Sequence, residues 1–182
     1  AAKDADVMAA WAGLGYYARA RNLVACASAV AARGAFPDNA AALRALPGVG
    51  DYTSAAAASI AFGEAVPVVD GNVERVISRM IALVVPPKRA VDEVKAAVSA
   101  MLAPRRPGDF AQAMMDLGAT VCTPKSPACG ICPVRDWCAA GRAGAALDYP
   151  KKAPKKARAN WQGVAFVAVN AKGEVLLRRR PP

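Results

Sequence analysis

Residues 46–50 read Leu-Pro-Gly-Val-Gly, a turn with two glycines, and the sequence on both sides has helical spacing. Glycine suits a tight turn where the backbone takes a positive φ or lets another molecule approach closely. The helix that follows begins at the turn, so its unpaired N–H groups and positive dipole end face outward. The turn is therefore either an ordinary corner between helices or an anion site built from backbone. On a basic chain, that anion would be a nucleic-acid phosphate.

The composition favours a polyanionic partner. The 182 residues include 24 Lys and Arg against 14 Asp and Glu, which gives a formal charge of +10, and this balance suits nucleic acid. Histidine is absent, which excludes Ser-His and Cys-His nucleophile pairs and histidine metal ligands. No apolar run approaches the roughly 20 residues of a membrane span, so no membrane partner is predicted. The start at Ala1 and the end at Pro182 indicate a fragment of a longer protein.

Apolar spacing predicts helices throughout the part of the chain before Gly144, so this part is expected to be all-α. The helix at 51–62 is rich in alanine and other small residues, which let another backbone come close. The expected helices are Ala5–Ala12, one opened by Tyr16 and Tyr17, Ala40–Ala45, Asp51–Phe62, one marked by Val73 through Val84, one marked by Val91 through Leu102, and Phe110–Val121.

Asp70 lies at the start of a predicted helix. An extended apolar segment, Val66–Val69, leads into Asp70, Gly71 and Asn72. An isolated aspartate at this position is by default a helix N-cap. The same position would also keep the carboxylate ionised and aim it at whatever lies before the helix.

Tyr16, Arg19 and Arg21 form a second candidate contact surface. Tyr16 and Tyr17 follow Gly15, and the two arginines come within the next turn and a half. This pattern is either a pair of core tyrosines beside a solvated basic face or an aromatic wedge with phosphate clamps.

The strongest chemical signal is a cluster of four of the chain's five cysteines: Cys122, Cys129, Cys132 and Cys138. Interleaved prolines preclude a continuous helix there, and such clustering favours a metal site over disulfides. Zinc and a 4Fe–4S cluster both accept four thiolates. Zinc modules usually pair two close Cys-x₂-Cys knuckles, and only Cys129 and Cys132 are that close here. Cys26 stands alone and is expected to be a small buried apolar residue.

With these motifs in hand, the chain resembles the MutY-type adenine DNA glycosylases of the helix–hairpin–helix, 4Fe–4S superfamily. The resemblance runs from about Val7 to Cys138. The stretches at 11–23 and 112–119 are the ones most specific to the adenine enzymes of this superfamily. The matching stretches are 11–23 (WAGLGYYARARNL), 46–53 (LPGVGDYT), 69–73 (VDGNV), 112–119 (QAMMDLGA) and the cysteine spacing.

The resemblance implies that adenine mispaired with 8-oxoguanine or guanine is flipped out of duplex DNA and its glycosidic bond is hydrolysed. It implies that Asp70 stabilises the cationic sugar, with Asn72 beside it and Tyr52 facing the same pocket. The hairpin (Leu46, Gly48, Val49 and Gly50) would hold a phosphate, with a monovalent cation on its carbonyls. Tyr16 would intercalate beside 8-oxoguanine, and Arg19 and Arg21 would contact DNA. Cys122, Cys129, Cys132 and Cys138 would hold a 4Fe–4S cluster.

Two departures from the family pattern change what is expected. The family's glutamate general acid belongs to a helix upstream of Trp11, so the chain as given is expected to bind DNA but to be catalytically impaired. Asp51 also puts a carboxylate on the first turn of the phosphate-facing helix, which weakens that contact slightly.

Two alternatives remain. An endonuclease III-like lyase would share the hairpin, aspartate and cysteines, but it needs a Schiff-base lysine where this chain has Tyr52. A non-catalytic DNA-binding module with a structural metal is the other alternative.

The predicted organisation has three parts. A helical core spans 1–146 and includes the iron–sulfur loop 122–138. A basic linker spans 147–160, and 161–182 resembles the opening of a Nudix-like domain, with strands at 164–169 and 174–177 around a turn. An isolated hairpin is marginal, so it is expected to be loosely held. By resemblance, the protein is a monomer in the bacterial cytoplasm, associated with the nucleoid.

Overall fold

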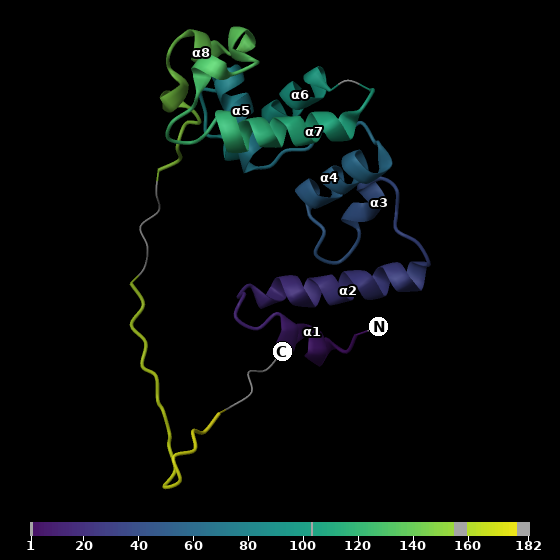
Figure 1. Cartoon of the computed structure of the whole chain (residues 1–182), viewed down its shortest axis with the longest axis vertical. Coiled ribbons are helices and arrows are strands. Elements are labelled where there is room, and N and C mark those ends of the chain that lie inside the picture. Colours follow the sequence, from purple (N-terminus) through teal and green to yellow (C-terminus); the bar gives the residue numbers. More distant parts are fainter. Residues whose placement is uncertain (1, 103, 155–159, 178–182) are drawn as a thin grey trace.

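The computed structural model describes residues 2–102, 104–154 and 160–177, and within these ranges the regular structure is helical (Figure 1). The α-helices are α1 (Asp4–Ala10), α2 (Tyr17–Arg33), α3 (Ala40–Arg44), α4 (Asp51–Phe62), α5 (Gly71–Met80), α6 (Val91–Met101), α7 (Pro107–Asp116) and α8 (Ala139–Arg142). Single 3₁₀ turns lie at Pro87–Arg89, Cys129–Ile131, Arg135–Trp137 and Ala146–Asp148, and a π-helical turn at Leu117–Val121. None of these described helices has the length and apolar character needed to cross a membrane.

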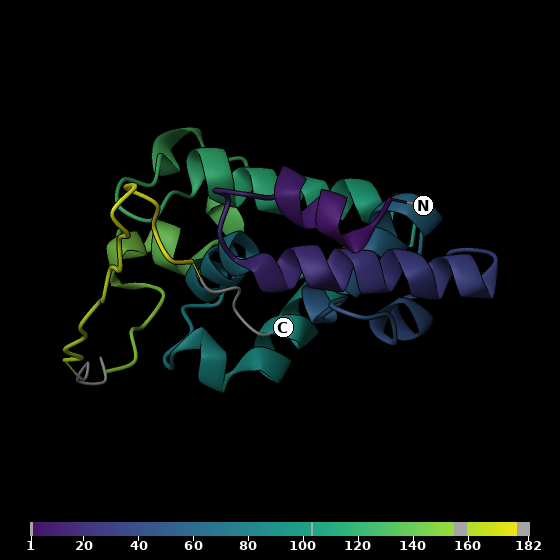
Figure 2. The same cartoon turned by 90° about the horizontal axis from the view of Figure 1, so that it is seen from below.

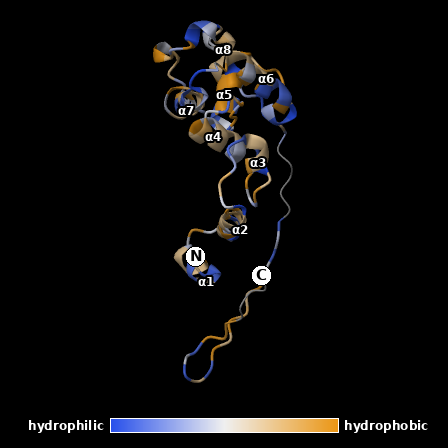
Figure 3. Ribbon diagram, turned by 90° about the vertical axis from the view of Figure 1, so that its right-hand side faces the viewer, coloured by the Kyte–Doolittle hydropathy of each residue, from blue (hydrophilic) through white to orange (hydrophobic). Residues whose placement is uncertain are grey.

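Helix α5 is the centre of the hydrophobic core. It packs against α6, α7, α8 and the π-helical turn (Figure 3). Its apolar residues recur three and four positions apart, so they form one buried stripe. The core side chains are Val73, Val76, Ile77, Leu83, Ala90, Val94, Val98 and Met114. The start of α5, where Asp70 lies, is therefore anchored by the hydrophobic core.

Helix α4 packs closely on α3 and α7 because its inward residues are small. Gly108, in the first turn of α7, lies so near α4 that a Cβ there would be 2.8 Å from the Ile60 Cα. The close approach expected from the composition of 51–62 is thus confirmed. Helices α1 and α2 run alongside each other, on the side of α3 and α4 that faces away from α7 (Figures 1 and 2).

Several helix ends differ from the sequence prediction, most clearly those of α5 and α7. Helix α5 stops at Met80 and does not continue to Val84, because Ala82 takes a left-handed φ of 49°. The helix expected over 110–121 begins at Pro107 and becomes a π-helical turn after Asp116. Cys26, expected to be buried, is half-buried on α2.

The predicted strands at 164–169 and 174–177 are not formed as regular strands. In their place, the described tail has one isolated antiparallel bridge between Val169 and Val175, closed by a turn around Lys172. Its side chains are solvent-exposed; Trp161 and Phe166 are more than 90% accessible. A two-stranded hairpin without a third strand or a helix to cover it is at best marginal in water, which accounts for the difference. Linker residues 155–159 and tail residues 178–182 lie outside the described residues.

Candidate functional site

The glycine turn joins α3 to α4 as the sequence predicts. Gly48 has a φ of 73°, the Val49 amide donates to the Leu46 carbonyl (3.2 Å), and the Ser54 amide donates to the Gly50 carbonyl (2.9 Å). Gly48 also touches α2: a Cβ at this position would lie 2.4 Å from the Asn22 Cβ. The turn thus needs glycine both for its backbone conformation and for the contact with α2.

The turn leaves its backbone accessible at the N-terminus of α4. Gly48 and Gly50 are exposed, while Leu46 and Val49 are half-buried and anchor the turn. Asp51, which follows, is not a free carboxylate: it forms ion pairs with Arg44 and with Lys95, whose Nζ is 3.7 Å from its Oδ2. Since cations on both sides offset its charge, Asp51 opposes an anion at this helix end less than the sequence suggests.

The Tyr16 side chain is exposed to solvent, and its backbone conformation is strained. It is the residue before α2, has a left-handed φ of 46°, and is 83% exposed. The Trp11 indole nitrogen donates to the Gly15 carbonyl (2.9 Å) and fixes the preceding corner. A non-glycine residue in this conformation costs free energy and commonly marks a functional position.

The basic residues of α2 come shortly after Tyr16 in the sequence. Arg19 and Arg21 are exposed, and the Arg19 guanidinium lies 5.9 Å from the Trp11 ring centroid. The next residue, Asn22, is the one that contacts Gly48. Helix α2 therefore brings its arginines beside the glycine turn, an arrangement that the sequence separation of the two segments does not reveal.

Asp70 caps α5 and is held by two hydrogen bonds. Its Oδ1 accepts from the Val73 amide (2.8 Å), and its Oδ2 accepts from the Asn72 Nδ2 (3.0 Å). Asp70 and Asn72 are both half-buried. The carboxylate thus has a fixed orientation and is still reachable from outside, as a group that acts on a ligand must be.

Tyr52 is on α4 and is 44% exposed. Its hydroxyl lies 3.5 Å from the Met115 sulfur, the one hydrogen-bond contact found for it among the described residues. The structure therefore brings Tyr52 next to α7 without a direct bond to Asp70. Tyr52 also lines a surface cavity with Val69, which immediately precedes Asp70, and with Lys95.

Arg75 is a site residue that sequence reasoning missed. Its Nη2 donates to the Asn72 Oδ1 (2.8 Å) and to the Gly118 carbonyl, and its Nε donates to the Cys122 carbonyl (2.8 Å). It thereby connects the residue that orients Asp70 to the π-helical turn and to the first cysteine of the loop. The available signal was its position three residues after Asn72, on the same helix face.

The π-helical turn fits against this network. A Cβ at Gly118 would lie 2.6 Å from the Asn72 Cβ, so only glycine allows the contact. Within the turn, the Cys122 amide donates to the Leu117 carbonyl (2.7 Å), five residues earlier. Wide turns of this kind often occur at functional sites, and this one joins α7 to the cysteine loop.

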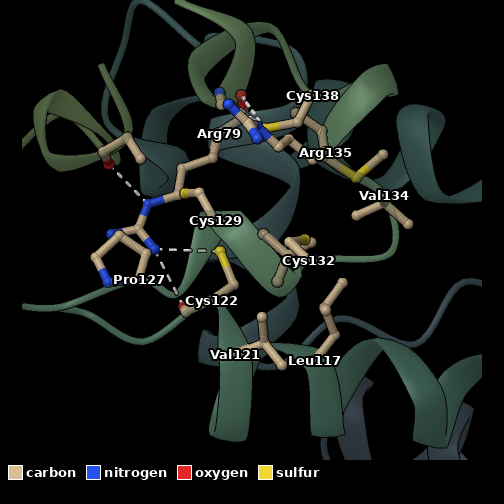
Figure 4. A pocket seen from close by; sticks show the side chains of 14 residues that line it. Arg79, Leu117, Val121, Cys122, Pro127, Cys129, Cys132, Val134, Arg135 and Cys138 are labelled. Atoms are coloured by element: carbon tan, nitrogen blue, oxygen red, sulfur yellow. Dashed lines mark hydrogen bonds between the residues drawn. The ribbon is translucent and has the colours of Figure 1, made fainter. Parts of the chain in front are cut away.

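The four clustered cysteines line a single cavity beside α5 (Figure 4). The other walls include Val76, Arg79, Leu117 and Val134. Cys138 is buried and its thiol accepts from the Gly141 amide (3.3 Å) at the start of α8. Burial raises the pKa of the Cys138 thiol, and the other three cysteines raise it further. Binding a metal centre would therefore release a proton from this thiol.

The four cysteines fit a 4Fe–4S cluster by their chemistry and by their place around one cavity. A single zinc ion would draw four thiolates to about 4 Å from one another, as follows from a Zn–S bond of about 2.3 Å. A cluster of irons and sulfides is larger and takes one thiolate at each corner, which suits four cysteines around a shared cavity.

A glycine hairpin between two helices, a carboxylate at a helix start and a four-cysteine cavity define an iron–sulfur protein of the helix–hairpin–helix class. Comparison with known families agrees: residues 1–100 match the HhH-GPD superfamily base excision DNA repair protein, and residues 122–138 match the iron-sulfur binding domain of endonuclease III. The chain therefore belongs to the HhH-GPD superfamily of base excision DNA repair proteins. The loop match indicates a 4Fe–4S cluster, which confirms the predicted cofactor.

Curated relatives named adenine DNA glycosylase confirm the resemblance found in the sequence. The protein from Arabidopsis thaliana is 46% identical over 162 residues, which cover 82% of this chain and 25% of the relative. The match to the protein from Homo sapiens has 48% identity and covers 74% of this chain and 26% of the relative. The match to the protein from Mycobacterium tuberculosis strain CDC 1551 has 44% identity and covers 79% of this chain and 48% of the relative. The chain thus spans about a quarter to a half of the length of these relatives.

Solved structures with the same fold include a DNA glycosylase and an endonuclease bound to DNA. A thermostable thymine-DNA glycosylase superposes with a TM-score of 0.69 at 27% identity, covering 78% of this chain and 67% of its own. A trapped endonuclease III–DNA covalent intermediate superposes with a TM-score of 0.64 at 26% identity, covering 79% of this chain and 68% of its own. The predicted helix–hairpin–helix fold is confirmed.

Proposed function

We propose that the protein is a monofunctional adenine DNA glycosylase that removes adenine opposite 8-oxoguanine or guanine by hydrolysing the N-glycosidic bond. The observation that carries this proposal is the fixed, half-buried carboxylate of Asp70 at the start of α5, oriented by Asn72. The names of the curated relatives support the choice of adenine. The protein acts as a monomer on one mispair in chromosomal DNA, which in a bacterium lies in the nucleoid.

Duplex DNA is held by the hairpin and by α2. The exposed amides around Gly48 and Gly50 donate to a backbone phosphate at the positive end of α4, and hairpin carbonyls bind a monovalent cation beside it. Arg19 and Arg21 neutralise further phosphates, so affinity falls as salt rises. Tyr16, outward and strained, enters the base stack beside 8-oxoguanine when adenine leaves it.

Gly48→Ala is expected to weaken DNA binding about tenfold or more. The added Cβ would clash with Asn22 and displace the turn, and one charge-assisted hydrogen bond to a phosphate is worth about 1.5–3 kcal/mol. Fluorescence anisotropy with a labelled duplex measures the effect. Gly63→Ala is the matched control, because Gly63 has nearly the same φ (72°) with nothing within 4 Å of a Cβ. Equal affinities of the two variants would contradict the role given to the Gly48 contact.

Catalysis depends on stabilising a positive charge. The target adenine must leave the stack, because its glycosidic bond is otherwise out of reach. As that bond breaks, the sugar becomes cationic, and the Asp70 carboxylate stabilises it through a preorganised electrostatic interaction. Asn72 holds the second carboxylate oxygen. We assign Tyr52, whose hydroxyl lies 3.5 Å from the Met115 sulfur on α7, to the wall of the same pocket. Arg75 keeps Asn72 in place from the opposite side.

The 4Fe–4S cluster is held by Cys122, Cys129, Cys132 and Cys138, which line its cavity. When bound, it supplies four metal–thiolate bonds that close the loop 122–138 into one structure. Lys125, in the first part of this loop, is exposed and can reach a phosphate once the loop is fixed. The loop therefore adds a third contact with DNA to those of the hairpin and α2.

A bifunctional lyase is the second candidate, and one observation favours it: Lys95 lines the same cavity as Tyr52. A lyase needs an amine that forms a Schiff base with the opened sugar. The amine of Lys95 is engaged in an ion pair with Asp51 (3.7 Å), and the residue that begins α4 next to the hairpin is Asp51, followed by Tyr52. These contacts favour the monofunctional reaction.

Single-turnover assays on a duplex with adenine opposite 8-oxoguanine test the proposed function. The whole protein is expected to release adenine and leave the strand uncut until alkali is added, and borohydride is expected to trap no efficient adduct with an abasic strand. The same assay on residues 1–182 alone tests the expectation of slow release. Strand cleavage as fast as base release, or trapping that disappears with Lys95→Gln, would establish the lyase instead.

A further inference from the structure

Arg79 is a buried cation whose bonds are all to neutral groups. It is 1% exposed and comes from the last turn of α5. Its Nε donates to the Ala146 carbonyl (2.8 Å) and the Tyr149 carbonyl (3.2 Å), and its Nη1 donates to the Thr123 carbonyl (2.9 Å). None of the ion pairs found among the described residues includes Arg79. A buried charge is costly unless an opposite charge lies nearby.

The nearest candidate for that opposite charge is the cysteine cavity. Arg79 lines this cavity, and its Nη1 donates to the Cys122 Sγ at 3.1 Å (Figure 4). A 4Fe–4S cluster with four thiolate ligands is an anion, because the thiolates and sulfides carry more negative charge than the irons carry positive. A cluster in this cavity would therefore neutralise the buried guanidinium.

The sulfurs of Cys122 and Cys138, at the two ends of the loop 122–138, accept hydrogen bonds from different kinds of donor. Cys138 receives the Gly141 amide at the start of α8 (3.3 Å), a neutral backbone donor. Cys122 receives the charged side chain of Arg79. For Cys129 and Cys132, no hydrogen bond to the sulfur is found within the described residues. The charged donor thus acts on one corner of the cluster, the one attached to the π-helical turn.

We propose that Arg79 is the internal counter-cation of the 4Fe–4S cluster, which sets the cluster's reduction potential and secures it at Cys122. A positive charge next to the cluster favours the state with one more electron, so Arg79 raises the potential. A charge-assisted hydrogen bond to a ligand sulfur also strengthens the hold of that ligand. The inference rests on the cofactor and is independent of which base the protein removes.

The test compares Arg79→Gln and Arg79→Lys in the holoprotein. Glutamine keeps an N–H donor but loses the charge, whereas lysine keeps the charge in a chain of similar length. Arg135→Gln is the matched control, because Arg135 also lines the cavity but is exposed to solvent. The readouts are the one-electron reduction potential, followed by electron paramagnetic resonance, and the rate at which iron is lost to a chelator.

Arg79→Gln is expected to lower the potential and to speed iron loss about 10–100-fold, the range typical of residues that support metal ligands. Arg79→Lys is expected to stay near the wild-type potential, and Arg135→Gln is expected to change little. If Arg79→Gln yields no cluster while Arg79→Lys does, the proposal stands. Equal potentials for the Lys and Gln variants, equal failure of both to hold iron, or an equal shift with Arg135→Gln would overturn it.

Discussion

Asp70→Asn is expected to reduce the single-turnover rate of adenine release by the whole protein about 10²–10³-fold, the loss typical when one preorganised electrostatic group is removed. An amide has the shape of the carboxylate but lacks the charge that stabilises the cationic sugar. Asparagine is as good an N-cap as aspartate, so the bond from the Val73 amide and the start of α5 are expected to persist. The substitution therefore separates catalysis from folding.

Three measurements make the Asp70 prediction decisive. Base release is followed on the mispaired duplex, DNA affinity by anisotropy, and unfolding by urea titration, with only the first expected to change strongly. Asp92→Asn is the matched control, because Asp92 also lies in the first turn of a helix, α6, and is exposed to solvent. An Asp70→Asn enzyme as fast as the wild type would remove Asp70 from the mechanism.

Cys138→Ser is expected to abolish cluster binding and to unfold the loop 122–138. The wild-type protein should contain about four irons per chain, as a cluster with four cysteine ligands requires. Cys138 is the buried cysteine and the N-cap of α8, so no exposed thiol can replace it. Binding free energy of a structural metal centre is also folding free energy, and without the cluster the Arg79 charge would remain buried and unneutralised.

Iron analysis and limited proteolysis measure this effect. The variant is expected to contain little iron and to be cleaved rapidly within the loop, and its DNA affinity should fall because Lys125 is no longer held. Cys26→Ser is the control: Cys26 lies on α2, away from the cavity, and the variant should keep its iron. A Cys138→Ser protein with full iron content, or stoichiometric zinc in the wild type, would show that the assignment of ligands or cofactor is wrong.

The sequence alone was sufficient for features that depend on short-range patterns. The bounds of α4 agree with the predicted 51–62, because glycines flank a run of small helix-forming residues. Asp70 was placed at a helix start because Gly71 and Asn72 follow an extended apolar segment. The spacing of the cysteines, with the loop's prolines, was enough to predict a metal centre, and the resemblance to adenine DNA glycosylases supplied its kind.

Tertiary structure decided the features that depend on residues distant in sequence. The π-helical turn at 117–121 replaces a predicted α-helix where Arg75, more than forty residues earlier, bonds to the Gly118 and Cys122 carbonyls. The predicted strands at 164–169 and 174–177 remain a single bridge, since nothing in the described structure covers their apolar residues. The contact between Arg79 and Cys122 likewise spans 43 positions. Local spacing specifies which residues can form a helix or bind a metal, but only the packing of α5 against the loop determines which charges and carbonyls meet.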